Sequence, residues 1–171
     1  MAIQPTPASK IAVGYYRIYS KLNPAFGLGI IDQTQAAPAL FLVNMAGADP
    51  AKTRFHLTLS SSPADGSFHI SMDGYPSYYL TWPDAPGANQ PWLCYTSQSN
   101  YPYLLQSANS RYNFNVGTCD PWVEIAGAPG DGGFSGSVFD IPRGIVVNGA
   151  QIYYFTENGG DNQQWMFEQV S

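Results

Sequence analysis

The sequence predicts a single all-β domain of about twelve strands, arranged as three similar segments. Short runs in which apolar and polar residues alternate are typical of half-buried strands. These runs recur at a spacing of a little over 50 residues, and the 17 glycines and 14 prolines provide turns between them. No run combines apolar residues at helical spacing with capping residues, so we expect no helix. The length suits one domain, 1–171.

Each segment is predicted to open and close with a strand. Residues 14–19 and 66–71 alternate in the same way, and residues 121–125 form a looser third copy. The closing strands are predicted at 53–59, 110–116 and 163–170, each with an aromatic residue followed by an apolar residue two positions later. These aromatic residues are Phe55, Tyr112 and Trp165. We therefore interpret Trp165 mainly as a core residue.

Two more strands lie between the opening and closing strands of each segment. They are predicted at 28–31 and 40–43, at 78–82 and 92–95, and at 138–139 and 152–155. The segments then span about 14–65, 66–119 and 120–171. Three copies of a four-stranded unit suggest a closed barrel with pseudo-threefold symmetry, because closure removes exposed strand edges.

Composition and charge argue against several classes of function. The net charge is −5 and the seven basic residues form no cluster, which disfavours binding to nucleic acid or to an anionic membrane surface. No apolar run is long enough for membrane insertion, and the N-terminal residues do not resemble a secretory signal. The expected location is the cytoplasm, with release by another route left open. Cys94 and Cys119 are expected to be reduced, although spacing alone leaves a disulfide between them open.

The sequence predicts no cofactor, no metal site and no enzymatic activity. His56 and His69 stand at polar strand positions without Cys, Asp or Glu at metal-binding spacing. The sequence around Ser135 lacks the spacing of a nucleophile elbow. Asp140 and Glu157 are a conceivable glycosidase pair, but nothing indicates their separation or a raised pKa.

The third segment carries the clearest functional pattern. Asp140 follows an apolar strand, a second strand is predicted at 152–155, and the pattern ends in Asn162-Gln163-Gln164-Trp165. This pattern resembles the ricin B-chain-type lectin repeat with its Q-x-W motif, over roughly a third of the chain. The resemblance implies a β-trefoil fold. The short chain is also similar to the fungal, single-domain members of that family.

The resemblance also implies a sugar site. The Asp140 carboxylate would accept hydrogen bonds from two hydroxyls, and the Asn162 amide can both donate and accept, with Gln163 in support. The apolar face of a sugar ring would pack on Phe155, for which Tyr153 on the same strand face is the substitute. In the family, such Asp and Asn residues select galactose or N-acetylgalactosamine. Asp140 alone could also be an ordinary turn residue, and Gln163 could simply hold a hairpin to backbone groups.

The first two segments depart from this pattern. In place of Gln-x-Trp they have Thr53-Arg54-Phe55 and Ser110-Arg111-Tyr112. The residue nearest to the position of Asp140 is Thr81 in the second segment, and in the first Asp32 is close but offset. We therefore predict one competent site, with Asp32 as a weak second site.

Three functions compete at this point. The first is a non-enzymatic lectin whose partners are glycans or glycoproteins, with homo-oligomerisation left open as a source of avidity. The second is a trefoil protease inhibitor that acts through loops 82–91 and 127–133. The third is a lectin-like accessory subunit with a vestigial sugar site, which binds a partner protein through tyrosine-rich surfaces at 75–79 and 100–103.

Overall fold

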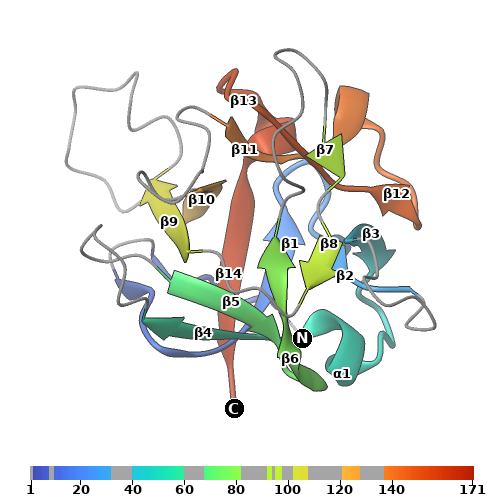
Figure 1. Cartoon of the computed structure of the whole chain (residues 1–171). Helices are drawn as coiled ribbons and strands as arrows, with labels where there is room; N and C mark the ends of the chain where they lie inside the picture. Colours follow the sequence, from blue (N-terminus) through green and yellow to red (C-terminus); the bar gives the residue numbers. More distant parts are fainter. Residues whose placement is uncertain are drawn as a thin grey trace.

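The computed structural model describes residues 2–7, 10–31, 40–59, 68–81, 92–93, 95–97, 102–107, 121–127 and 137–171. These residues confirm a nearly all-β protein (Figure 1). The first segment contains β1 (Gly14–Ser20), β2 (Phe26–Gly29), β3 (Phe41–Asn44) and β4 (Phe55–Leu59). The second contains β5 (Phe68–Met72), β6 (Tyr75–Thr81), β7 (Trp92–Leu93), β8 (Tyr95–Ser97) and β9 (Pro102–Ser107). The third contains β10 (Trp122–Gly127), β11 (Ser137–Asp140), β12 (Ala150–Gln151), β13 (Tyr153–Thr156) and β14 (Trp165–Val170).

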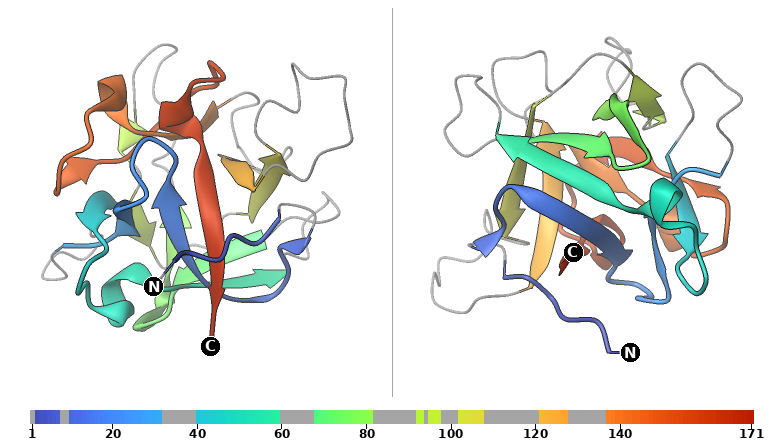
Figure 2. Two further views of the ribbon diagram at one scale, coloured as in Figure 1. Left: turned by 180° about the vertical axis from the view of Figure 1, so that it is seen from behind. Right: turned by 90° about the horizontal axis from the view of Figure 1, so that it is seen from below.

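Six of these strands close into a ring. β1 pairs with β4, β4 with β5, β5 with β9, β9 with β10, β10 with β14, and β14 again with β1, all antiparallel. Each segment thus contributes its first and last strands to one barrel, which is seen from below in Figure 2. The middle strands of the segments form the hairpins β2–β3, β6–β8 and β11–β13. A six-stranded barrel that carries three hairpins is the β-trefoil fold.

The core fills the inside of this barrel. Alternate residues of the barrel strands are fully buried, which explains the apolar–polar alternation of the sequence. Trp165 is 0% exposed and its Nε1 donates to the carbonyl of Phe139 at 3.2 Å, so its interpretation as a core residue is confirmed. Phe55 is equally buried at the start of β4, whereas Tyr112 lies outside the described residues. The other fully buried barrel residues include Tyr16, Ile18, Leu57, Ile70, Val123, Ile125 and Phe167.

The expectation of no helix was wrong at one point. Residues Pro50–Thr53 form the short helix α1, and the predicted strand 53–59 therefore begins only at Phe55. The Asp49 carboxylate caps this helix by accepting from the Ala51 N–H at 3.0 Å, and Pro50 stands in the first turn. A single turn is too short to show an apolar period, which is why the sequence pattern missed it. Two short 3₁₀ turns, η2 (Pro142–Gly144) and η3 (Asp161–Gln163), follow in the third segment.

The closing strand of the second segment was also predicted in the wrong place. β9, residues Pro102–Ser107, occupies the barrel position between β5 and β10 that we expected for residues 110–116. Pro102 is tolerated because it stands at the first residue of the strand. Residues 110–116, Cys94 and Cys119 lie outside the described residues. Within the described ranges, no helix is long and apolar enough to cross a membrane.

Candidate functional site

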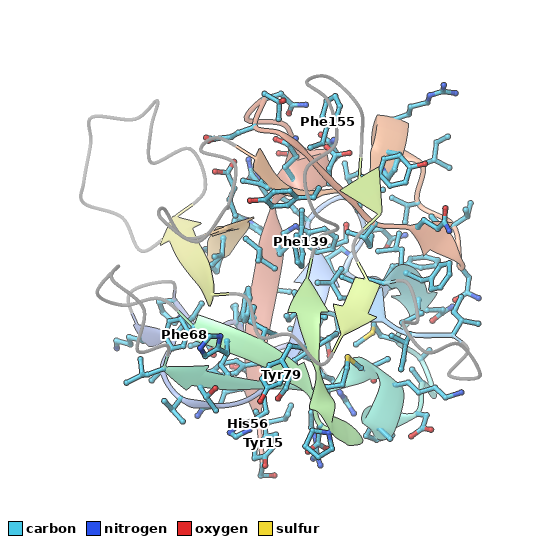
Figure 3. The ribbon with its side chains drawn as sticks, in the orientation of Figure 1. Tyr15, His56, Phe68, Tyr79, Phe139 and Phe155 are labelled. Atoms are coloured by element: carbon cyan, nitrogen blue, oxygen red, sulfur yellow. The ribbon has the colours of Figure 1, made fainter. Side chains whose placement is uncertain are left out.

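The hairpin β11–β13 of the third segment brings the predicted site residues to one surface. Phe139 and Tyr154 face each other across the hairpin and are both buried in the core, with their rings edge to face at 6.3 Å. Because side chains alternate along a strand, the neighbouring pairs Asp140–Tyr153 and Val138–Phe155 lie on the opposite face, here called the outer face. On it Val138 and Asp140 are buried, whereas Tyr153 is half-buried and Phe155 is exposed. Figure 3 shows Phe139 within the molecule and Phe155 at its upper end.

Asp140 is the centre of a hydrogen-bonded cluster. Its Oδ2 accepts from Asn162 Nδ2 at 2.6 Å and from Gln163 Nε2 at 2.9 Å. The residue is only 5% exposed, and burial raises the pKa of its carboxyl while the hydrogen bond from Gln163 partly offsets this rise. No donor among the described residues bonds the second oxygen, Oδ1. The carboxylate is therefore oriented through one of its two oxygens.

Gln163 joins this cluster to the backbone of the hairpin. Besides Asp140, its Nε2 contacts the carbonyl of Thr156 at 2.9 Å, and its Oε1 accepts from the Asn158 N–H at 2.7 Å. The residue is 0% exposed. The interpretation of Gln163 as a hairpin support is confirmed, and the same side chain also orients Asp140. Sequence reasoning missed Thr156 and Asn158, because backbone groups leave no signal in residue type.

Asn162 is held beside Asp140 by the turn η3. The Asn162 carbonyl accepts from the Ile141 N–H at 2.9 Å, which ties the end of β11 to this turn. Gly160 precedes the turn, and a Cβ at that position would overlap Asn162 Oδ1, so a residue with a side chain would push the amide aside. Asn162 remains half-buried and is therefore accessible to a ligand on the outer face.

Two aromatic side chains flank Asp140 on the outer face. Tyr153 stands directly opposite Asp140 and is half-buried, whereas Phe155 stands two residue pairs further, opposite Val138, and is 36% exposed. The register thus places Tyr153 closer to the carboxylate than Phe155. Counting residues back from Trp165 could not show which aromatic residue lies opposite Asp140. The predicted strand 152–155 is preceded by a separate strand, β12, which pairs with β3 of the first segment and ends at Gln151, and β13 begins only at Tyr153.

The same position is different in the other two segments. In the first hairpin the buried pair Leu28–Leu42 corresponds to Phe139–Tyr154, so Gly29 occupies the place of Asp140. Asp32, the weak second candidate, lies outside the described residues. In the second hairpin Leu80 is buried, which puts Thr81 in the place of Asp140, opposite Tyr95.

The two histidines pack against tyrosine rings. His56 stacks on Tyr15 with ring centres 4.5 Å apart, and His69 contacts Tyr79 edge to face at 6.2 Å. Figure 3 shows Tyr15 and His56 at the end of the molecule opposite to Phe155. Among the described residues, no group of His, Cys, Asp or Glu side chains could hold a metal ion.

Comparisons with known proteins give likenesses in structure but not in sequence. No family profile matches the chain. No curated protein matches it either. The Rhizoctonia solani agglutinin matches with a TM-score of 0.73 and 14% identity, over 94% of this chain and 97% of that one. The Macrolepiota procera ricin B-like lectin, solved with lactose, matches with a TM-score of 0.70 and 11% identity, over 94% and 99%.

Two further structures widen the range of functions found on this fold. A mosquitocidal holotoxin matches with a TM-score of 0.72 and 14% identity, over 94% of this chain but only 18% of the toxin. The chain thus spans less than a fifth of that protein. A proteinase inhibitor from Coprinopsis cinerea matches with a TM-score of 0.59 and 10% identity, over 94% and 99%. At such identities the comparisons establish the fold, and the chain is a β-trefoil.

Proposed function

We propose that this protein is a non-enzymatic carbohydrate-binding protein whose sugar site lies on the hairpin β11–β13. The observation that supports it is the convergence of Asn162 and Gln163 on one oxygen of Asp140, on an outer face that also carries Tyr153. A carboxylate held in this way suits a ligand with several hydroxyl groups. The likeness in fold to an agglutinin and to a lectin solved with lactose agrees with this function.

Each group of the site has a part in binding. Asp140 Oδ1 accepts a hydrogen bond from a sugar hydroxyl, which is strengthened by the negative charge of the carboxylate. The Asn162 amide serves a neighbouring hydroxyl. Tyr153, with Phe155 beyond it, offers an aromatic surface to the C–H face of the ring. The bonds to Oδ2 fix the carboxylate before the ligand arrives, so little side-chain freedom is lost on binding.

Galactose- and N-acetylgalactosamine-type glycans are the proposed ligands, because the family pattern of Asp140 and Asn162 selects these sugars. A single shallow site of this kind binds with a Kd of about 1 mM, or about −4 kcal/mol. Clustered glycans on glycoproteins, or a homo-oligomer of this chain, would raise the apparent affinity.

A glycan array with the wild-type protein, two variants of Asp140 and one control variant tests this proposal. Asp140→Ala removes the acceptor and should abolish binding, whereas Asp140→Asn keeps an acceptor for both amides and should fold while binding weakly. Thr81→Ala is the matched control, because Thr81 occupies the same register position in the second hairpin. Binding of no glycan by the wild-type protein, or equal binding by Asp140→Ala, would contradict the proposal.

The second candidate function is protease inhibition, which is favoured by the likeness in fold to the Coprinopsis cinerea inhibitor. Loop 82–91 and residues 128–133 of the other candidate loop lie outside the described residues. Assays against cysteine and serine proteases decide between the two functions. Sub-micromolar inhibition that is unchanged by galactose and by Asp140→Ala would favour the inhibitor. A protein partner that is captured without any glycan binding would favour the accessory subunit.

A further inference from the structure

Lys21 belongs to the first segment but contacts the turn that carries Asn162. It follows the last residue of β1, and its backbone N–H donates to the Gln164 carbonyl at 3.0 Å. Its Nζ donates to Gln164 Oε1 at 2.5 Å and forms an ion pair with Asp161 Oδ1 at 3.0 Å. The ammonium also lies 5.5 Å from the ring centre of Trp122, at the start of β10.

These contacts hold both ends of the turn η3. Asp161 directly precedes Asn162, and Gln164 directly follows Gln163. Lys21 therefore contacts the turn on either side of the two amides that bond Asp140. Gln164 is only 1% exposed, and its Nε2 reaches back to the Gly159 carbonyl at 3.3 Å. The turn itself has no side-chain cap at Gly160. The ammonium of Lys21 therefore adds a side-chain link between this turn and the end of β1.

The first segment has a bridge at the corresponding place. The Asp73 N–H donates to the Arg54 carbonyl at 2.9 Å, and Arg54 Nε donates to Asp73 Oδ2 at 2.7 Å. Arg54 precedes the buried Phe55 as Gln164 precedes the buried Trp165, and Asp73 follows β5 as Lys21 follows β1. A side-chain bridge between neighbouring segments thus recurs in the trefoil. The bridge made by Lys21 is the one that borders the proposed sugar site.

We propose that Lys21 is a positioning residue for the sugar site, so that the site depends on two segments of the trefoil. Its role in binding rests on the proposed function, whereas its role in placing the two amides does not. Without the ammonium, the buried Gln164 Oε1 loses its donor and the side chain must turn to find another. Asp161 is 58% exposed and can be hydrated instead, so the bond to Gln164 is the more important of the two.

The side-chain amide signals of Asn162 and Gln163 in NMR spectra of the intact chain provide the test. Lys21→Met keeps the apolar stem but removes the donor, and it should shift both amide signals and speed their exchange with water. Lys21→Arg retains a cationic donor and should restore the wild-type signals. Galactose affinity should fall about fivefold or more in Lys21→Met and recover in Lys21→Arg.

Asp73→Ala is the matched control, because it breaks the equivalent bridge of the first segment. It should lower thermal stability yet leave the Asn162 and Gln163 signals unchanged, which separates positioning from general destabilisation. Asp161→Asn, at an exposed position, serves if Lys21→Met does not fold, and it should shift the same signals to a smaller extent.

Two outcomes would overturn the inference. One is a Lys21→Met spectrum in which the signals of Asn162 and Gln163 are unchanged, and the other is an equal change in Asp73→Ala. If the wild-type protein binds no sugar, the proposed function fails, but the amide signals still decide whether Lys21 positions the turn.

Discussion

The hairpins β2–β3 and β11–β13 follow the same backbone course and differ on their outer faces. The pair Leu28–Leu42 is buried in one as Phe139–Tyr154 is in the other. The Ile30 N–H donates to the Lys52 carbonyl at 3.0 Å, just as Ile141 donates to Asn162 at 2.9 Å. The core-facing half of each hairpin is thus constrained by packing. The outer faces differ, and only that of β11–β13 carries a carboxylate bonded by two amides.

The difference at the position of Asp140 has a steric cause. Gly29 stands there in the first hairpin, and a Cβ on Gly29 would lie 2.8 Å from Val43 Cγ2 and 3.0 Å from the Lys52 carbonyl. Lys52 and Thr53, at the end of the helix α1, thus occupy the space that a side chain at position 29 would need. The first segment therefore keeps the barrel strands and the hairpin, but an aspartate side chain does not fit at Gly29.

The largest losses of stability should come from the core position that a buried aromatic residue occupies in both the first and the third segment. Trp165→Ala and Phe55→Ala should each cost about 3–5 kcal/mol, because both remove a fully buried aromatic side chain from the core. Urea unfolding measures both. Trp165→Ala should cost more, since it also removes the hydrogen bond from Trp165 Nε1 to the Phe139 carbonyl. A cost below about 1 kcal/mol for either one would contradict the common core.

A carboxylate at position 29 of the first hairpin should not reproduce the arrangement around Asp140. Gly29→Asp forces a side chain against Val43 and the Lys52 carbonyl and should destabilise the protein by about 3 kcal/mol, without adding a sugar site. Urea unfolding and galactose titration of this variant check both parts. A stable Gly29→Asp variant that binds a second galactose would show that the two hairpins differ only in sequence.

Gln163 and Thr53 occupy corresponding positions and should differ in importance. Gln163→Ala removes the bonds to Asp140, Thr156 and Asn158, and should cost about 2 kcal/mol along with most of the galactose affinity. Thr53→Ala removes only a bond from Oγ1 to the Asp49 carbonyl at 3.0 Å, and should cost about 1 kcal/mol. If the two variants lose equal free energy of unfolding in urea, or if Gln163→Ala binds galactose as the wild type does, Gln163 is no more important than Thr53.

The smallest expected effect is a pH dependence of the third hairpin, where a buried aspartate stands in place of Gly29 of the first. Burial raises the pKa of Asp140, so the folded protein holds this proton more tightly than the unfolded chain does. Its contribution to stability is complete at low pH and is lost as the pH rises through the raised pKa. Sugar binding needs the ionised carboxylate, so affinity should fall as the pH drops through the same pKa, earlier than for an ordinary aspartate.

Asp140→Asn is the reference for this pH dependence, because it does not titrate. The difference between wild type and this variant cancels the other acidic groups, in both urea unfolding and galactose titration. Wild type should lose stability relative to Asp140→Asn as the pH rises, and should lose affinity relative to it as the pH falls. Parallel curves for the two proteins would show that Asp140 stays ionised throughout.

Much of the fold could be predicted from the sequence, because strand alternation reports directly on burial. Trp165 and Phe55 marked the closing strands correctly. Asp140, Asn162 and Gln163 also lie together as the pattern predicted. The helix α1 and the place of β9 were missed, because a single capped turn and a pairing partner leave little trace in residue type. The nearness of Tyr153 to Asp140 depends on register, which the spacing of the motif does not determine.

The pairing of β14 with β1 has a consequence for the order of folding. Tyr15 pairs with Val170, so the barrel closes only when strands from opposite ends of the described chain meet. Pairing between residues so distant in sequence is slow, since a long loop must close before any contact is gained. The turn with Asn162 and Gln163 leads directly into β14. The proposed sugar site should therefore form late in refolding, together with closure of the barrel.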